Sequence, residues 1–566
     1  MGFTKLLGLA YLGLSLGPGC VGPSLNAAEP TSAPRFAEVA SGAGIHFQYQ
    51  PGRTKTKYLP ETMGAGVALL DVNGDGWLDL YLVNSGWVEG GERPANQLYL
   101  GRGNWRFEAV PDAGGATGKS YGMGVCAGDL DRDGDPDLYL TAYGPDQLLR
   151  NDGGKFTDIS VAAGIDNPLW SSSCTFLDYD QDGFLDLFVT NYVDFTVTKH
   201  KECKSRESSL IEYCLPSDYG PVSSVLYHNR GDGSFEDVSR KAGIAGHLGK
   251  GLGVMAGDFN SDGAQDILVA NDTFPTHLFL NQGGGRFRED ALLAGCAYNY
   301  QGRAPGGMGI APGDVDGDGA EDFLITNFAQ EPNSLYRRLA PGSFDDVSEA
   351  FQIAAPSFWR LGFGTGLLDV DGDGDLDLFV TNGHISDVIE QVLKISDLTY
   401  AQQPLLLLNQ SGTRFEVVTD SAGDYFRSRW VGRGAAFGDL DNDGDYDIVV
   451  THNNAPPALL RNDSARGRHT LVELVAGADG RSPLGARVEL TISGRTQMRI
   501  VRAAYSYLSS SDLRLAFGHG APSAIDRLRV VWPDGQEVDY GGAPAGKWLR
   551  LREDSPRIEV RQLATP

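Results

Sequence analysis

The stretch AGDLDRDGDPDLYLT, from Ala127 to Thr141, places five aspartates within nine residues and then continues as an apolar run. Carboxylates this close repel one another, and an ionised carboxylate is costly to bury without a partner. The crowding therefore indicates a bound cation. The stretch fits the pattern D-x-[DN]-x-D-G-x-x-D, in which positions 1, 3, 5 and 9 offer side-chain oxygens to Ca²⁺ and position 7 offers a backbone carbonyl. Glycine at position 6 permits the sharp turn.

The pattern occurs seven times along the chain, and we number these loops 1 to 7 in chain order. Glycine stands at position 6 in every copy. The residues at positions 1, 3, 5 and 9 of each loop, which are the candidate metal ligands, are Asp71, Asn73, Asp75 and Asp79; Asp129, Asp131, Asp133 and Asp137; Asp178, Asp180, Asp182 and Asp186; Asp258, Asn260, Asp262 and Asp266; Asp314, Asp316, Asp318 and Asp322; Asp369, Asp371, Asp373 and Asp377; and Asp439, Asp441, Asp443 and Asp447.

Hard oxygen ligands at this flexible spacing suit Ca²⁺ better than Mg²⁺ or Zn²⁺, so we expect up to seven structural calcium ions. An EF-hand would have a glutamate at position 12 and a helix after the loop. These loops instead lead directly into runs such as LYLT and LFVT, which are typical of strands. The loops are therefore predicted to be turns between two strands.

The loops begin 49 to 80 residues apart, and the residues around them are self-similar. Upstream lies a strand with a Gly-x-Gly pattern, replaced by Ser171 and Ser173 in the third repeat. Small residues there would let strands crowd near an axis. Downstream lie the apolar strand, a third strand, a tight turn and a fourth strand. Four antiparallel strands repeated seven times predict a β-propeller, with a linear solenoid as the alternative.

The two ends of the repeat region favour the propeller. A fourth-strand sequence at Phe36 precedes any acidic loop, and the last repeat has a third strand from Ala458 with no fourth strand after it. Pairing the two would close a ring and leave no free sheet edge there. We therefore predict an all-β fold, a seven-bladed β-propeller over residues 34–463 that is closed by an N-terminal strand and interrupted by insertions at residues 192–222 and 383–404.

The second insertion contains ISDVIEQVLKISDL, whose apolar residues recur at helical spacing. Loops carried on a rigid scaffold are where recognition usually resides. Packing of this helix against the propeller is the alternative interpretation.

After Asn462 the sequence changes character, and residues 468–560 are predicted to form a small C-terminal β domain. Its stretches LGAR, YLSSSD and VVWPDG resemble the ASPIC/UnbV domain. The acidic-loop repeats resemble the FG-GAP/VCBS repeat family of integrin α-subunit propellers and bacterial secreted proteins. The combination is similar to the cartilage acidic protein family and its bacterial relatives. This resemblance implies the architecture more than an activity.

Residues 1–28 are predicted to be a secretory signal. MGFTKLLGLAYLGLSLGPGC has one lysine followed by an apolar run that is too short to span a bilayer. Cys20 is a candidate for lipid attachment, with an ordinary cleaved signal as the alternative. No later segment is long and apolar enough to form a transmembrane span. We expect an exported protein that is periplasmic, at the cell surface or extracellular.

The other five cysteines suggest a disulfide framework. Cys203 and Cys214 lie within one insertion and are predicted to form a disulfide. Cys126 and Cys174 lie just upstream of successive loops, and either a bridge between neighbouring strands or two buried thiols would fit. The sequence around Cys296 does not indicate whether this residue is bonded or free.

The formal net charge of −27 has a local origin, because 26 of the 74 acidic residues stand at positions 1, 3, 5 and 9 of the loops. Seven bound Ca²⁺ ions would offset about half of it. An acidic surface repels phosphates, and the sequence has no basic patch, so we expect no nucleic acid partner.

No H-E-x-x-H or P-loop pattern is present. We expect a secreted calcium-binding propeller that acts as a protein- or glycan-binding, or adhesion, platform at the cell surface. The alternative is an extracytoplasmic enzyme, a hydrolase, lyase or oxidoreductase with its site in the propeller funnel. His384 is the histidine to examine first, with turn hydrogen bonding as its alternative role. The RGD sequence at Arg230 is interpreted as part of a hairpin turn.

Overall fold

Seven four-stranded sheets form the first part of the fold. The computed structural model describes residues 34–91, 93–205, 208–464, 469–475, 477–478 and 480–564. The predicted signal at residues 1–28, with Cys20, lies outside the described residues. We number the sheets 1 to 7 after the acidic loop that each contains.

The strands of sheets 1 to 4 are, in order, β2 (Val67–Leu70), β3 (Asp79–Leu82), β4 (Gln97–Gly101) and β5 (Phe107–Ala109); β6 (Tyr121–Gly128), β7 (Asp137–Tyr143), β8 (Gln147–Asn151) and β9 (Phe156–Asp158); β10 (Ser171–Leu177), β11 (Asp186–Asn191), β15 (Val225–Asn229) and β16 (Phe235–Asp237); and β18 (Gly251–Gly257), β19 (Asp266–Asn271), β20 (His277–Asn281) and β21 (Phe287–Glu289). The strands of sheets 5 to 7 are β22 (Ile310–Gly313), β23 (Asp322–Ile325), β24 (Ser334–Ala340) and β25 (Ser343–Asp346); β26 (Gly362–Leu368), β27 (Asp377–Asn382), β28 (Leu405–Asn409) and β29 (Phe415–Val417); and β30 (Gly432–Gly438), β31 (Asp447–His452), β32 (Ala458–Asn462) and β1 (Phe36–Glu38).

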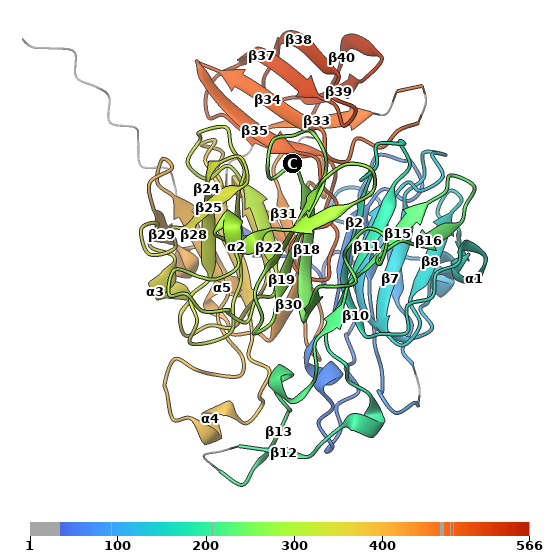
Figure 1. The fold of residues 1–566 in the computed structure, drawn as a ribbon. Helices are drawn as coiled ribbons and strands as arrows, with labels where there is room; N and C mark the ends of the chain where they lie inside the picture. Colours follow the sequence, from blue (N-terminus) through green and yellow to red (C-terminus); the bar gives the residue numbers. More distant parts are fainter. Residues whose placement is uncertain are drawn as a thin grey trace, which may run out of the picture. The chain divides into compact units, whose positions relative to one another are not determined.

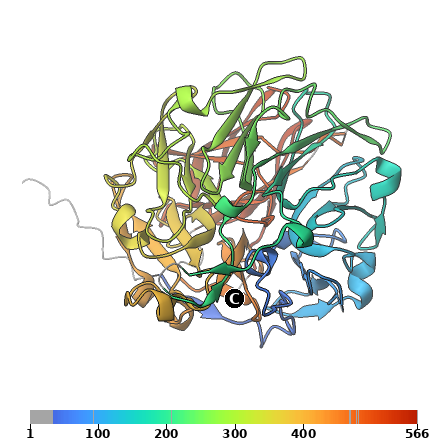
Figure 2. The same ribbon diagram turned by 60° about the horizontal axis from the view of Figure 1, so that its bottom comes forward.

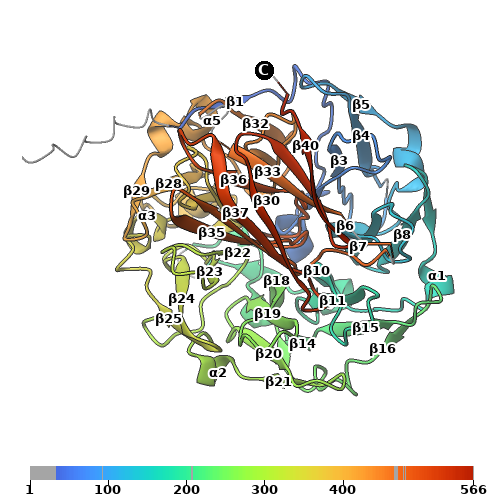
Figure 3. The ribbon, with the colours of Figure 1, turned by 90° about the horizontal axis from the view of Figure 1, so that it is seen from above.

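The first strands of the seven sheets contact one another in a closed cycle, which runs β2, β6, β10, β18, β22, β26, β30 and back to β2. Figure 3 shows the sheets arranged around a common centre. In sheet 7 the N-terminal strand β1 pairs antiparallel with β32, so that Phe36 faces Asn462. The predicted all-β propeller fold is confirmed, and each sheet has the strand order expected of one blade.

The glycines of the first strands permit this close approach. A Cβ atom on Gly66 would lie 2.8 Å from the Cα atom of Gly124 in the next sheet. A Cβ atom on Gly364 would lie 2.6 Å from the backbone nitrogen of Ala435. No side chain fits at such distances, so the Gly-x-Gly pattern is a packing requirement of the inner strands.

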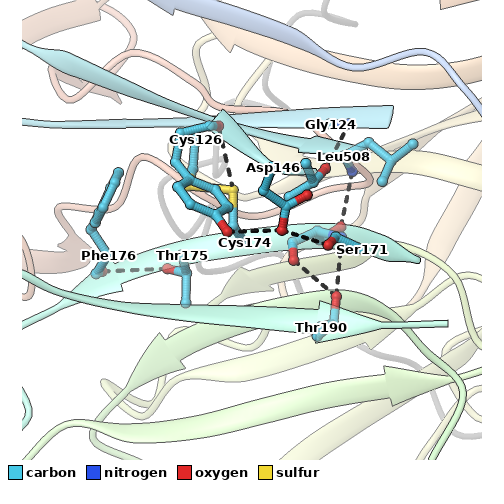
Figure 4. Close-up of a disulfide and its surroundings, with 12 residues drawn as sticks. Gly124, Cys126, Asp146, Ser171, Cys174, Thr175, Phe176, Thr190 and Leu508 are labelled. Carbon is cyan, nitrogen blue, oxygen red and sulfur yellow. Dashed lines mark hydrogen bonds between the residues drawn. A yellow bond between two sulfur atoms is a disulfide. The ribbon is translucent and has the colours of Figure 1, made fainter. Parts of the chain in front are cut away.

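Two disulfides are present among the described residues. Cys203 and Cys214 are bonded within the first insertion, as predicted. Cys126 in β6 and Cys174 in β10 are also bonded, with their Cα atoms 5.9 Å apart, which joins sheets 2 and 3 (Figure 4). Of the two alternatives for this pair, the bridge is the one observed. Cys296 is buried and free.

The insertions add little regular structure. The first insertion contains the two-stranded pair β12 (Cys203–Lys204) and β13 (Ile211–Glu212), and β14 (Val222–Ser223) pairs with β17 (Leu248–Gly249). The predicted helix of the second insertion is a single turn, α4 (Ile389–Val392), because the chain turns extended at Leu393. The other α-helices are also single turns, namely α1 (Ser160–Ala163), α2 (Ala291–Ala294), α3 (Ala354–Ser357) and α5 (Asp424–Arg427). None of the helices that the structure describes is long and apolar enough for a membrane crossing.

The C-terminal β domain contains two four-stranded sheets, ordered β36-β33-β39-β40 and β35-β34-β37-β38. Their strands are β33 (His469–Val475), β34 (Arg487–Ile492), β35 (Arg495–Ile500), β36 (Leu515–Gly518), β37 (Ala524–Val531), β38 (Glu537–Pro544), β39 (Trp548–Arg552) and β40 (Ser555–Arg561). Side chains from both sheets, among them Val472 and Leu528, share one hydrophobic core. Figure 1 shows this domain at one end of the propeller and the insertions at the other.

Residues 505–512 leave the C-terminal domain and fill the centre of the propeller; we call them the central segment. Its backbone forms hydrogen bonds with first strands of several sheets. The Ser510 nitrogen donates to the Val67 carbonyl at 2.9 Å, and the Leu69 nitrogen donates to the Ser510 carbonyl at 3.0 Å. The Val125 nitrogen donates to the Leu508 carbonyl at 3.1 Å. The C-terminal domain is thus anchored by pairing with the ring.

Further contacts place the central segment against other sheets. The Ser506 and Ile310 backbones exchange hydrogen bonds of 2.6 and 3.0 Å. Tyr507 and Leu508 are buried in one hydrophobic cluster with Met123 and Phe363. Each of these last two is the middle residue of a Gly-x-Gly pattern. The centre of the ring is therefore packed with protein.

Truncation of Leu508 to alanine tests this packing. We expect Leu508→Ala to lower the free energy of unfolding by about 2–4 kcal/mol, because the side chain is buried and the surrounding ring cannot collapse onto the cavity. Denaturant unfolding of the full chain measures the change. Leu513→Ala is the control, since Leu513 is 36% exposed and its truncation should change stability by less than about 0.5 kcal/mol. Equal effects of the two substitutions would contradict the central placement.

Candidate metal sites

Each acidic loop joins the first and second strands of its sheet, as the sequence predicts. The aspartate at position 1 accepts a hydrogen bond from the backbone nitrogen of the glycine at position 6 in all seven loops, at 2.7–3.0 Å. That glycine has a φ between +83° and +105° in every copy. Only glycine adopts this conformation without strain, which explains its presence at all seven positions.

The aspartate at position 9 holds each loop to the rest of its sheet. One of its oxygens accepts the backbone N–H of position 2, at 2.9–3.2 Å. The other accepts a backbone N–H from the third strand, at 2.7–2.9 Å. The side chain is almost wholly buried in every loop. It therefore has a structural role besides its candidate role as a ligand.

Burial makes these carboxylates hard to ionise in the absence of a cation. Desolvation raises the pKa of Asp137 to about 8 and that of Asp186 to about 9, with neighbouring loop aspartates adding to the shift. Desolvation also raises the pKa of Asp129, at position 1, to about 6. The hydrogen bonds within the loops oppose these shifts without cancelling them.

Several loop oxygens are buried and have no hydrogen-bond partner within the part of the chain that the structure describes. They are Oδ1 of Asp129 and Asp178, at position 1, and Oδ1 of Asp371 and Asp441, at position 3. A buried acceptor left in this state is destabilising by about 1–3 kcal/mol, and by more when it is charged. A bound cation would supply the missing partner.

Ligand atoms of positions 1, 3 and 9 converge closely enough to share an ion. In loops 2, 3 and 5 these atoms all lie within 4.8 Å of one another. Ca²⁺ binds oxygen ligands at about 2.3–2.6 Å, so an ion between atoms this close could contact all of them. The all-oxygen donor set and the orphaned oxygens together fit a hard divalent cation.

Loops 6 and 7 lie beneath the C-terminal domain. Asp371 and Asp439 are 5% and 0% exposed. Arg514 donates to the Asp439 carbonyl at 2.7 Å, and Arg495 donates to the Asp373 carbonyl at 3.1 Å. Arg495 also pairs with the Asp375 carboxylate at position 7. The domain therefore docks on these turns through backbone carbonyls and a carboxylate that is not at position 1, 3, 5 or 9. The sequence reasoning did not identify these contacts, because the two partners are far apart in the chain.

Other residues singled out from the sequence have structural roles. His384 is buried, and its Nδ1 accepts a hydrogen bond from the Ser386 nitrogen at 3.0 Å. Burial lowers its pKa to about 4, so the turn-bonding alternative describes it. Arg230 lies between β15 and β16 and pairs with Glu236 at 2.9 Å, consistent with a hairpin turn.

Comparison with known proteins identifies two families. The description FG-GAP-like repeat matches residues 71–140, 129–189, 214–269, 258–325 and 314–380. The description ASPIC and UnbV matches residues 477–557. Cartilage acidic protein 1 of Mus musculus is 26% identical over 509 residues, which cover 85% of this chain and 72% of that protein. The Homo sapiens protein of the same name is 25% identical over 510 residues, covering 85% and 70%.

Matches among solved structures are more distant. An Agrocybe aegerita protein, described as recognising non-reducing terminal N-acetylglucosamine, has a TM-score of 0.40 and 16% identity over 69% of this chain and 87% of its own. Rhamnogalacturonan lyase YesW has a TM-score of 0.36 and 13% identity over 71% and 72%.

The double role of position 9 is testable without any metal. In a chelator at pH 8, we expect Asp266→Asn to lower the free energy of unfolding by about 1–3 kcal/mol, because an amide NH₂ must then face one of two N–H donors. Asp262→Asn, at exposed position 5, is the matched control, since its remaining oxygen still accepts the Ala264 N–H. Denaturant titration compares the two. Equal stability of both variants would show that position 9 has no structural role of its own.

Proposed function

This chain belongs to the FG-GAP-like repeat family and carries an ASPIC and UnbV domain, and from that premise we propose that it is an exported, calcium-stabilised β-propeller that binds a protein or a glycan at the cell surface. Three parts of this proposal have separate support, namely the metal, the compartment and the binding face.

Calcium is supported by the charge and geometry of the seven loops. Each loop gathers three to five carboxylates between two paired strands, and several of their oxygens have no hydrogen-bond partner among the described residues. A divalent ion in each loop would satisfy these oxygens and relieve the repulsion among the carboxylates. Because the ligands come from a turn that also bonds to the third strand, ion binding would stabilise the whole sheet.

Export is supported by the two disulfides. Disulfides persist in oxidising compartments outside the cytoplasm and are rare within it. The bridge between Cys126 and Cys174 joins two sheets of the propeller, so it is part of the fold's core. Millimolar extracellular calcium would also match the affinity usual for extracellular calcium modules, about 10⁻⁴–10⁻³ M.

The binding face is assigned to the end of the propeller that carries the insertions. We define the insertion face as residues 53–61, 192–222 and 383–404. Figure 2 brings this face forward and shows the first insertion, in green, beside the N-terminal segment, in blue. The rings of Tyr58 and His200 lie 4.7 Å apart. Ser386 donates to Glu212 at 3.0 Å, which joins the two insertions.

The observation that carries this assignment is the filled centre of the ring. The central segment occupies the funnel in which an enzyme of this fold could hold a substrate, and the C-terminal domain covers loops 6 and 7. The insertion face has no such cover from the C-terminal domain in Figure 1, and it exposes apolar side chains, with Leu210 37% and Leu215 48% exposed. Exposed apolar groups on loops of a rigid scaffold suit recognition of a partner.

Metal removal tests the calcium proposal. A site with Kd of 10⁻⁴ M at 1 mM Ca²⁺ adds about 1.4 kcal/mol to the free energy of unfolding, so seven such sites add about 10 kcal/mol. We expect excess EGTA to lower the Tm by roughly 10 °C or more and added Ca²⁺ to restore it. Elemental analysis should find calcium in the purified protein. An unchanged melt, with no calcium found, would remove the proposal.

Binding by the insertion face is tested on arrays of glycans and of purified extracellular proteins. We expect the variant with Leu210→Asp and Leu215→Asp to lose at least about ten-fold in affinity for whatever the unaltered chain binds, because charges would replace apolar contacts. Leu292→Asp with Leu293→Asp, on exposed α2, is the matched control and should bind normally. The assignment fails if the control variant loses binding and the insertion-face variant keeps it.

A further inference from the structure

Loop 3 differs from the other six loops in the residue that overhangs it. In each sheet, one residue of the third strand donates its backbone N–H to the position 9 aspartate. The residue just before this donor in the sequence differs among the sheets. Leucine or arginine stands there in six sheets, as Leu100, Arg150, Leu280, Arg337, Leu408 and Arg461. In sheet 3 the residue is His228. Histidine is the only one of the three residue types that can donate a lone pair to a metal ion.

The imidazole of His228 faces the ligands of loop 3. Its Nδ1 lies 3.1 Å from Oδ1 of Asp186 and 3.4 Å from Oδ2 of Asp180. The edge of the Tyr179 ring packs against it, with ring centroids 6.1 Å apart. Single ligand atoms of Asp180, Asp182 and His228 all lie within 4.8 Å of one another. Two side chains of the loop and one side chain of β15 thus converge on one point.

A second observation indicates that loop 3, like loops 2, 6 and 7, holds a cation. Oδ1 of Asp178 is buried and has no hydrogen-bond partner among the described residues. The other oxygen of the same carboxylate accepts the Gly183 N–H at 2.9 Å, which fixes the side chain in the loop. Single ligand atoms of Asp178, Asp180 and Asp186 lie within 4.8 Å of one another, so the orphaned oxygen belongs to a carboxylate that lines the same ion site.

The mixed donor set selects a different class of ion from the other loops. Ca²⁺ prefers oxygen ligands only, whereas imidazole nitrogen suits Zn²⁺ and its first-row neighbours, which also accept carboxylate oxygens. We propose that loop 3 binds a first-row divalent transition metal of the Zn²⁺ class through Asp180, Asp182 and His228, in place of Ca²⁺. This inference rests on one part of the proposed function, namely that loop 3 binds a divalent cation.

The competing role for His228 is that of a charge partner. Arg337 shows that role in sheet 5, where its Nη1 lies 3.4 Å from Oδ2 of Asp316. A charge partner neutralises the loop but gives it no preference among metals. The two roles therefore predict different metal selectivity for loop 3.

The test uses the full chain, stripped of metal and then held in 1 mM CaCl₂. Co²⁺ serves as the spectroscopic probe, because its visible absorption reports nitrogen ligation and low coordination number. We expect one Co²⁺ per chain to bind with an intense visible band, Zn²⁺ to displace it, and one Ca²⁺ to be released. In His228→Leu, the affinity for Co²⁺ should fall at least about ten-fold.

Two matched controls separate this result from damage to the fold. Leucine stands at this position in three other sheets, so His228→Leu should fold, and its melting curve in Ca²⁺ checks this. Arg150→Leu makes the same change beside loop 2 and should leave Co²⁺ binding unaltered. Absence of Co²⁺ binding in the unaltered chain, or equal binding by His228→Leu, would overturn the inference. Calcium counted in the same samples tests the proposed function separately.

Discussion

The fold depends on one carboxylate in each sheet, the aspartate at position 9 of the acidic turn. Its two oxygens accept backbone N–H groups from the turn and from the third strand, so a single buried side chain joins three strands. The other aspartates lie in the same turn, and in loops 2, 3 and 5 ligand atoms of positions 1, 3 and 9 are within 4.8 Å of one another. The resulting concentration of negative charge is what the protein must offset, and a divalent cation in each turn would do so. The hydrogen bonds of the position 9 aspartate and a cation bound in the turn would thus stabilise the same three strands.

Closure of the ring depends on contacts between distant parts of the chain. The N-terminal strand completes sheet 7, and the Gly-x-Gly strands approach at distances that leave no room for a side chain. The central segment then pairs with the inner strands of several sheets. Arginines of the C-terminal domain add contacts with the backbone of loops 6 and 7. The domain and the propeller consequently form one packed unit, and the funnel is occupied.

Much of the fold could be predicted because its signals are local and repeated. Loop positions, strand order and the pairing of Phe36 with the last sheet all follow from a motif that recurs within each repeat. The bridge from Cys126 to Cys174 could not be settled, since it requires the register between two sheets. The placement of Leu508 at the centre of the ring could not be predicted either, because its partners lie hundreds of residues away in the sequence. The segment also has no strand-like alternation of apolar and polar residues. His228 was missed because only the fold brings it to loop 3.

Crystals grown in CaCl₂ and measured for anomalous scattering would test the central claim most directly. If transition metals are removed beforehand, we expect a calcium peak in each of the seven acidic turns, at about 2.3–2.6 Å from oxygens of its ligand side chains. Turns filled only by water, with their carboxylates held apart by hydrogen bonds to solvent, would contradict it.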